Sequence, residues 1–352
     1  MKKILKAKLP ELWQRISADF DLFLPIEKNK ILNFSLWKEE EKVNLDRVRT
    51  NASPKHLVFP QTETYLKFKN ENENKKLSLK AVKAKGEEYV LFGVRPCDVE
   101  SFKLLDNIFL RDPVDTYYKE HRDRGTVISL ACSNPEDTCF CNSFGIDATS
   151  APLGADIATW DIGDSFLWKA QSEKGQKLME NTKEFFIDIQ EKDTQNLEQE
   201  KDDIQENLKD LPFNNIDLSK IKGTQQEIFD REEIWNEFSE RCLACGTCSY
   251  LCPTCHCYDL RDYKGSNHNH GEKFRCWDSC MSSDFTLMAH GNPRTSQMQR
   301  LRQRFMHKLV YYPKNHEGVY SCVGCGRCVE KCPVHIDIIK IIKKLGGENN
   351  EL

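Results

Sequence analysis

The chain has 352 residues, 16 of them cysteine, and a net charge of −4. At roughly 150 residues per domain this length predicts about two domains, which excludes a small scaffold stapled by disulfides. No uninterrupted apolar stretch reaches the roughly 18 residues that a membrane helix needs, and the acidic balance gives nucleic acid no overall attraction. The first 20 residues also lack the apolar core of an export signal. We therefore expect a cytoplasmic protein with no membrane insertion and no nucleic-acid partner, whose cysteines serve a purpose other than disulfides.

The first half of the chain has the pattern of a small α/β layer domain. Apolar residues at helical spacing predict a helix over residues 9–20. Two short runs of strand-favouring residues, 89–94 and 126–131, are separated by a helical pattern over 99–109. A strand pair over 157–160 and 165–168 turns at Gly163. Together these elements predict an α/β front domain over residues 1–183.

The second half is expected to be helical. Residues 184–211 carry ten acidic and three basic side chains, which favours an exposed helical bridge, and we place that bridge at 184–230. Helical periodicity returns before residue 242, and again over 295–312 and 336–345. The 295–312 stretch is basic and fits an ordinary amphipathic helix, or one whose cations offset negative charge nearby. We predict a mainly helical two-cluster ferredoxin-type domain over 231–352.

Two stretches of this second domain share the pattern CxxCxxCxxxCP, the spacing of bacterial ferredoxin loops. In two-cluster ferredoxins the fourth cysteine of each loop binds the other cluster. A pair of zinc ribbons is the alternative, but such ribbons usually present CxxC pairs without the trailing proline. We predict two [4Fe-4S] clusters with crossed ligation, one on Cys242, Cys245, Cys248 and Cys332 and one on Cys322, Cys325, Cys328 and Cys252.

The insert between the two loops adds four cysteines in the strings CPTCHCYD and RCWDSC. Cys255, Cys257 and Cys280 are candidate ligands of a further iron–sulfur cluster, while the role of Cys276 stays open. Buried thiols without a metal are the alternative, because free cysteine packs as a small hydrophobe. Histidines of the insert are possible partners in a mixed site: His256, His268 and His270.

The front domain has a cysteine quartet of its own. Cys97 follows one predicted strand and Cys132 follows the next, so both are expected at the same edge of the sheet. Cys139 and Cys141 come shortly afterwards in the string CSNPEDTCFC. These four residues are candidate ligands of another iron–sulfur cluster; unligated thiols, zinc and a redox-active pair are the alternatives.

The sequence lacks several familiar catalytic patterns. It contains no GxGxxG after a strand, no GxxxxGK[ST], no GxSxG and no HExxH. What remains is one-electron chemistry, for which a chain of this kind needs a donor and an acceptor on other subunits. The alternative is a catalytic subunit in which the extra cysteine region reduces a disulfide or thiol substrate directly.

Six strings in this order resemble the family that contains the electron-transfer subunit of anaerobic sulfite reductase and the beta subunit of sulfhydrogenase: GVRPCD, ACSNPEDTCFCNSFG, CLACGTCSYLCPTCHCYD, RCWDSC, DFTLMAHGNPR and CVGCGRCVEKCPVHIDI. The resemblance implies an iron–sulfur subunit of an anaerobic oxidoreductase complex. Its partners would be an FAD- and NAD(P)H-binding flavoprotein subunit together with a terminal subunit resembling a sulfite reductase, a hydrogenase or a transhydrogenase. It also implies that the eight cysteines of the two loops are cluster ligands, and that the front quartet matches additional thiols of the family.

Overall fold

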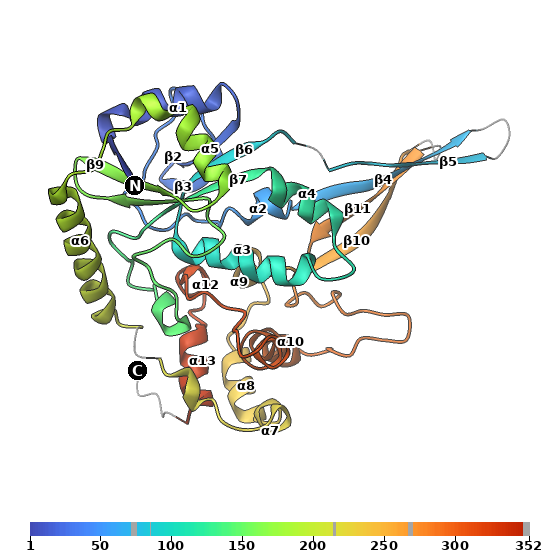
Figure 1. Ribbon diagram of the computed structural model, residues 1–352. Coiled ribbons are helices and arrows are strands. Elements are labelled where there is room, and N and C mark those ends of the chain that lie inside the picture. Colours follow the sequence, from blue (N-terminus) through green and yellow to red (C-terminus); the bar gives the residue numbers. More distant parts are fainter. Residues whose placement is uncertain (72–75, 85, 214–215, 267–269, 348–352) are drawn as a thin grey trace.

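The structure is a computed structural model, and it describes residues 1–71, 76–84, 86–213, 216–266 and 270–347. A seven-stranded mixed sheet forms the centre of the front half, in the order β1-β9-β8-β7-β6-β2-β3 (Figure 1). Its strands are β1 (Lys2–Leu5), β2 (Asp21–Lys28), β3 (Ile31–Leu36), β6 (Tyr89–Val94), β7 (Gly125–Leu130), β8 (Ile157–Asp161) and β9 (Ser165–Ala170). The four strands β2, β6, β7 and β8 are parallel neighbours, and every residue of β6 and β7 is buried. Strands covered on both faces read as continuous apolar runs, which is why these two were visible in the sequence.

Helices cover both faces of this sheet. α1 (Leu9–Ser17) and α5 (Glu173–Asn181) pack on one face, where Val90 and Phe92 point. α3 (Pro96–Phe109) and α4 (Thr116–Arg124), together with the short α2 (Lys55–Val58), pack on the other, toward which Leu91 points. Successive side chains of a strand point to opposite faces, so one strand supplies both cores. The predicted strand, helix, strand unit and the β8–β9 hairpin are confirmed.

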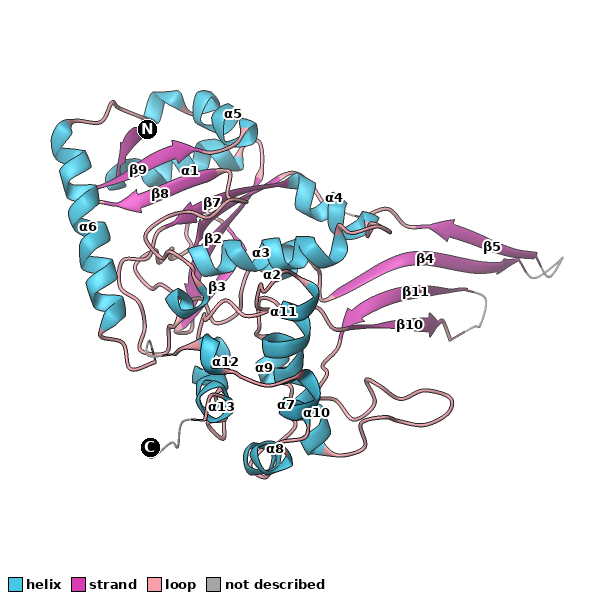
Figure 2. Ribbon diagram, turned by 60° about the horizontal axis from the view of Figure 1, so that its bottom comes forward, coloured by secondary structure: helices cyan, strands magenta, loops and turns pink. Residues whose placement is uncertain are grey.

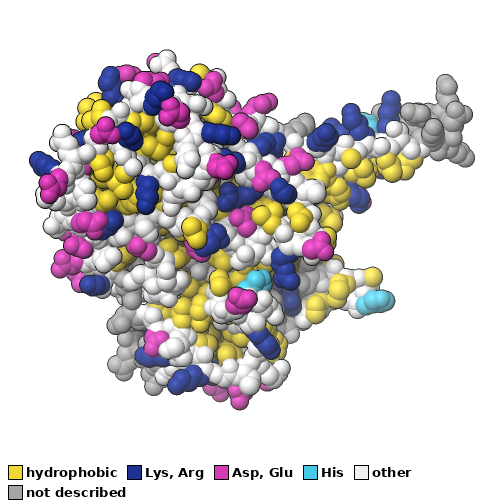
Figure 3. Space-filling model, viewed as in Figure 1, with side chains coloured by type: hydrophobic (Ala, Val, Ile, Leu, Met, Phe, Trp, Pro, Cys, Tyr) yellow, Lys and Arg dark blue, Asp and Glu magenta, His cyan; other side chains and the backbone are white. Residues whose placement is uncertain are grey.

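Four antiparallel strands form a second sheet that projects from the body as an arm (Figures 1 and 2). Its strands, in the order β10-β11-β4-β5, are β10 (Tyr258–Lys264), β11 (His270–Trp277), β4 (Thr62–Glu71) and β5 (Lys76–Ala81). Two of them come from the front half and two from the Cys-rich insert. The expectation of a mainly helical second domain is therefore not confirmed for the insert. Hydrophobic side chains lie along the arm (Figure 3), and among them Leu77, Leu79 and Leu260 are more than half exposed.

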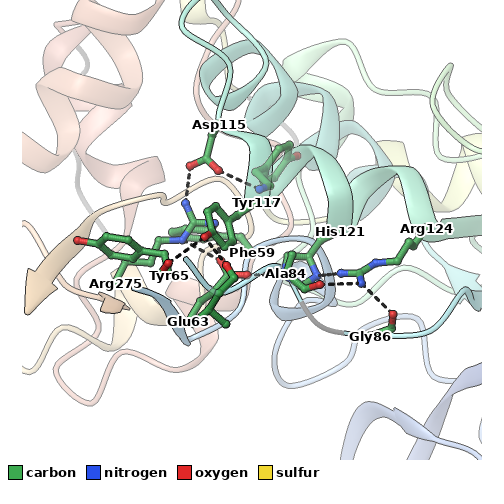
Figure 4. Close-up of polar contacts among 12 residues, drawn as sticks. Phe59, Glu63, Tyr65, Ala84, Gly86, Asp115, Tyr117, His121, Arg124 and Arg275 are labelled. Atoms are coloured by element: carbon green, nitrogen blue, oxygen red, sulfur yellow. Dashed lines mark hydrogen bonds and ion pairs between the residues drawn. The ribbon is translucent and has the colours of Figure 1, made fainter. Parts of the chain in front are cut away.

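A polar network fastens the base of the arm to α4 (Figure 4). Arg275 of β11 donates to Glu63 of β4, with Nη2 and Oε2 2.8 Å apart, and pairs with Asp115, the N-cap of α4. Glu63 also lies 2.6 Å from Nε2 of His121 in α4. The Tyr117 hydroxyl donates to the backbone carbonyl of Tyr65 in β4 at 3.1 Å. These contacts fix the arm where it leaves the body.

Short helices surround the cysteine loops in the second half. Figure 1 shows α3 above α9 and α12, so the helix that follows β6 borders the Cys-rich region. The helices are α6 (Glu191–Lys209), α7 (Gln225–Phe229), α8 (Glu232–Ser239), α9 (Thr247–Tyr250), α10 (Gln297–Met306), a π-helix (His307–Tyr311), α11 (Tyr312–Asn315), α12 (Arg327–Glu330) and α13 (Ile338–Leu345); single 3-10 turns lie at Lys6–Lys8, Cys141–Phe144, Lys183–Phe185 and Leu218–Lys220. The apolar faces of α7, α8, α10, α12 and α13 form one core around Trp235, Leu301 and Ile342, whereas α6 packs against the front half through Leu197 and Ile204. Within the described residues, no helix combines the length and the apolar character that crossing a membrane requires.

The helix predicted over 295–312 is interrupted. α10 begins after Ser296, whose hydroxyl accepts from the Gln299 amide while the Gln299 side chain accepts in return, a capping box. After Met306 the helix widens into the π-helix before continuing as α11. Insertions of this kind are frequent at functional sites. Lys308, which lies in the wide turn, is buried.

Candidate iron–sulfur sites

The first Cys loop (residues 242–252) and the second Cys loop (residues 322–332) have the same local geometry. In each, a glycine with positive φ caps a one-turn helix that carries the third cysteine: Gly246 at +72° before α9 and Gly326 at +73° before α12. Residues other than glycine rarely adopt this backbone conformation. The repeated turn therefore explains why glycine recurs at the same place in both loops.

The fourth cysteine of the second loop lies with the first three of the other. One cavity is lined by Cys332 and Cys328 of the second loop and by three first-loop cysteines, with Met281 and Leu301 among the apolar residues around it; the first-loop thiols are Cys242, Cys245 and Cys248. This is the crossed arrangement that the ferredoxin pattern predicts. Because one thiol comes from a loop about 80 residues away, the cavity forms only when both loops are in place.

The fourth cysteine of the first loop lies with the second loop in the same way. Cys252 is buried, and it is close enough to Cys322, Cys325 and Cys328 for its negative charge to raise the pKa of all three, although burial is the larger cause of each increase. These neighbours agree with two crossed sets of four thiols, and the assignment of the individual ligands stays a prediction.

Hydrogen bonds reach the sulfur atoms from several directions. Nε2 of Gln297 donates to Cys242 Sγ at 3.1 Å, and the Ile336 amide donates to Cys332 Sγ at 3.2 Å. Thr247 Oγ1 lies 3.3 Å from Cys245 Sγ and lowers the pKa of that thiol. Donors to cluster sulfurs are among the factors that set reduction potentials.

Three buried cations surround Cys252 and Cys255 without a carboxylate partner. Lys55, Arg304 and Lys308 are each 3% exposed or less. Arg304 donates to Cys255 Sγ at 3.2 Å and to a backbone carbonyl, while the two lysines bond only to carbonyl and hydroxyl oxygens. Within the described parts of the chain, none of the three forms an ion pair with Asp or Glu. An unpaired buried charge is costly, so negative charge at the neighbouring Cys252 and Cys255 stabilises these three cations.

The pKa values of the two lysines shift in opposite directions, although the same two thiols act on both. Burial lowers the pKa of Lys308, but the negative charge of Cys252 and Cys255 outweighs it and raises the pKa above its usual range. For Lys55 burial prevails over the same two thiols and lowers the pKa to about 8. Thiolate-bound clusters carry negative charge, so the donor set of four thiols and the surrounding cations fit a [4Fe-4S] cluster between the loops.

The thiols of the insert lie beside the two loops. Cys255 is within hydrogen-bonding distance of Cys252, and Cys257 within that distance of Cys280. The second contact leaves the proton on Cys257 and lowers the pKa of Cys280 to about 6. Cys276 lies apart from them, on β11 at the edge of another cavity.

The insert histidines do not gather around these thiols. His256 is half-buried between Phe109 and His307, and burial lowers its pKa to about 4. His270 begins β11 and is exposed. His268 lies outside the described residues.

The four front cysteines come together at the carboxyl edge of the sheet. Cys97 lies in the first turn of α3, directly after β6, and Cys132 lies two residues after β7. Cys139 and Cys141 lie on the following loop, in contact with the second Cys loop through a backbone hydrogen bond from Phe140 to the Gly324 carbonyl, 2.9 Å long. The parallel pairing of β6 and β7 is what brings both strand ends to one edge, as the sequence predicted.

Across the described ranges, no three His, Cys, Asp or Glu side chains converge on one point as the ligands of a single metal ion would. In a cubane each thiolate binds a different iron atom, so four spaced thiols suit a cluster better than a tetrahedral zinc ion.

Sequence reasoning found some of the charged residues and missed others. The basic pattern over 295–312 indicated cations near a cluster, and Arg304 and Lys308 are buried there. Arg302 of the same stretch instead stacks on Phe229, 3.5 Å from the ring centre. Lys55 was missed, because nothing in the residues around it marks a lysine that folding brings to a loop about 200 residues away.

Comparison with known proteins agrees with this geometry. Residues 241–336 match the 4Fe-4S dicluster domain, so this region binds two [4Fe-4S] clusters. No solved structure matches the chain. Sulfhydrogenase 2 subunit beta of Pyrococcus furiosus is 30% identical over 345 residues, which cover 97% of both chains. The chain is therefore an iron–sulfur electron-transfer protein and belongs to the sulfhydrogenase beta subunit family.

Proposed function

We propose that this chain relays single electrons between a flavoprotein subunit that binds FAD and NAD(P)H and a terminal reductase or hydrogenase subunit, in an anaerobic cytoplasmic complex. A bound [4Fe-4S] cluster supplies the ability to accept and release one electron at a time. Its ligands are Cys242, Cys245, Cys248 and Cys332 in one site, and Cys322, Cys325, Cys328 and Cys252 in the other.

The crossed grouping of the two loops carries this proposal. In this proposal each loop contributes one cysteine to the thiol set of the other, which is supported by the cavity that cysteines of both loops line and by the position of Cys252 near the second loop. Arg304 borders both sets, since it lines the cavity with Cys332 and lies close to Cys252. Adjacent redox centres are what a relay requires.

The relative in Pyrococcus furiosus supports the partners, because its name describes one subunit of a sulfhydrogenase. The sequence itself has no dinucleotide fingerprint, so hydride chemistry would belong to another subunit.

Replacing Cys325 with Ser tests the relay. In the anoxically purified complex, NAD(P)H-driven turnover of the terminal subunit should fall to background, while NAD(P)H oxidation by artificial dyes at the flavoprotein continues. Cys276→Ser, outside both thiol sets, is the matched control and should retain both activities. Physiological turnover that survives Cys325→Ser would mean that electrons take another route.

A second candidate function rests on Cys257 and Cys280. Two thiols within hydrogen-bonding distance could reduce a disulfide substrate, with two electrons and two protons passing to it as they form their own disulfide. Alternatively Cys255, Cys257 and Cys280 hold a further cluster. Acid quenching and alkylation of the air-free oxidised protein distinguish the two: a Cys257–Cys280 disulfide supports thiol chemistry, and iron lost in Cys280→Ala supports a cluster.

A further inference from the structure

The front quartet is defined as Cys97, Cys132, Cys139 and Cys141. It lies outside the two ferredoxin loops in the sequence, and its cysteine spacing does not follow theirs. Cys97, Cys132 and Cys141 belong to one packed cluster together with Cys325, and the charge of Cys139 acts on both Cys132 and Cys141. Burial is the main cause of their raised pKa values, and the charge of another quartet member adds to the increase at Cys97, Cys132 and Cys141. Three of the four are less than 9% exposed. Burial alone would also describe inert thiols that pack as hydrophobes, so further observations must decide.

A buried arginine next to the quartet is the first such observation. Arg95 is 4% exposed, and its guanidinium donates to the carbonyl of Ala131 at 2.6 Å and to that of Leu45. Within the described residues it has no carboxylate ion pair, and Cys132 and Cys97 are the leading sources of negative charge around it. Asp161 and Asp46 also act on this guanidinium, but less than the two thiols do. A buried charge without an ion pair is costly, and a thiolate-bound centre on the quartet would place negative charge beside it.

The close fit between the quartet's loop and the second Cys loop is the second observation. A Cβ on Gly326 would lie 2.2 Å from the Thr138 carbonyl, and one on Gly324 would lie 2.6 Å from the Cα of Cys141. At these two glycines backbone packs directly on backbone, and beside them the Arg49 guanidinium bridges the loops, donating to Thr138 Oγ1 at 2.7 Å and to the Cys325 carbonyl at 2.9 Å. Cys97 and Cys139 are both close enough to feel the charge of Cys325.

From this geometry we propose that Cys97, Cys132, Cys139 and Cys141 hold a third [4Fe-4S] cluster, placed beside the cluster of the second Cys loop. It extends the relay out of the ferredoxin-type region to the carboxyl edge of the α/β sheet. The order of centres is then the first-loop set, the second-loop set and the front quartet. The inference rests on the proposed relay for its purpose, while the existence of the site can be tested separately.

Native mass spectrometry and metal analysis of the anoxically purified full chain test the site. Cys132→Ala should lose one cluster, about four iron atoms per chain, and keep the electron paramagnetic resonance signals of the remaining clusters. Cys276→Ala is the matched control and should keep the full iron content. If a folded Cys132→Ala chain keeps its full iron content, the proposal is overturned. It is also overturned if the unchanged chain holds one zinc ion that the variant lacks.

Two further measurements keep the result clear if Cys132→Ala fails to fold. Cys141→Ser, which nearly keeps the side-chain volume, should show the same loss of about four iron atoms. If native mass spectrometry of the unchanged protein finds only two clusters per chain, the third site is overturned, whatever result the variants give. Cys325→Ser should lose iron from the second-loop set even in that case, so failure of this inference remains distinguishable from failure of the proposed relay.

Discussion

Arg327 and Asp98 form a two-pronged ion pair between the second Cys loop and α3. Nη1 and Oδ1 are 2.6 Å apart, Nη2 and Oδ2 are 2.7 Å apart, and both side chains are 2% exposed. Arg327 also donates to the carbonyl of Thr50 at 2.9 Å. The pair joins the residue that follows Gly326 to the residue that follows Cys97, so it connects the two halves of the chain at their cysteines.

We expect Asp98→Ala to destabilise the chain by about 3–5 kcal/mol, because it leaves the Arg327 charge buried and unpaired. Denaturant unfolding of anoxic protein measures this change. Glu11→Ala, which removes an exposed ion pair with Lys8, is the control and should cost less than about 1 kcal/mol. Equal effects of the two substitutions would contradict the role of burial.

Gly326→Ala should disturb the contact between the two cysteine loops. A methyl group there meets the Thr138 carbonyl at 2.2 Å, and the positive φ of +73° adds strain, so we expect a loss of about 2–5 kcal/mol and a lower iron content. Iron analysis and denaturant unfolding measure the two effects.

Gly145→Ala separates strain from steric overlap. Gly145 has the same φ of +73°, but nothing lies within 4 Å of the position of its Cβ. Its substitution should cost only about 1–2 kcal/mol and leave iron in place. If both glycine variants behave alike, backbone strain alone explains the effect and the loop contact is unimportant.

The sequence predicts the cysteine sites better than their surroundings. Cys97 and Cys132 could be placed at one sheet edge because each follows a strong strand signal, and the crossed use of Cys252 and Cys332 follows from the ferredoxin spacing. Neither the Arg327–Asp98 pair nor the position of Lys55 leaves a local signal, since each depends on contacts about 200 residues apart in sequence. The pairing of β11 with β4 is missed for the same reason, because strand pairing at this separation is set by tertiary packing.

Lys308→Met should make the second-loop set harder to reduce. The lysine charge stabilises the electron that a cluster there gains, so its removal moves the reduction potential to a more negative value. Redox titration followed by paramagnetic resonance measures the shift. Lys314→Met removes an exposed charge from the same helical run and should leave the potential unchanged. A shift of equal size in both variants would indicate a general charge effect and not a local one.

Glu63 should make the stability of the arm depend on pH. Burial tends to raise the pKa of this carboxyl, but the hydrogen bond to His121 and the charge of Arg275 outweigh it, so the pKa is lower than its usual value near 4.5. A carboxyl with a lowered pKa in the folded state binds protons more readily when unfolded. Its contribution is therefore complete above about pH 4.5 and is lost as the pH falls through the folded value.

Glu63→Gln should accordingly lower the free energy of unfolding at pH 7.5 by about 1.5–3 kcal/mol and flatten its decline toward acid. Denaturant unfolding from pH 7.5 to 4 measures both effects, read only where visible absorbance shows that the clusters are intact. Glu11→Gln, at the exposed pair with Lys8, should run parallel to the unchanged protein. If Glu63→Gln runs parallel as well, the Glu63 carboxylate does not hold the arm to α4, and Arg275 is held there by Asp115 alone.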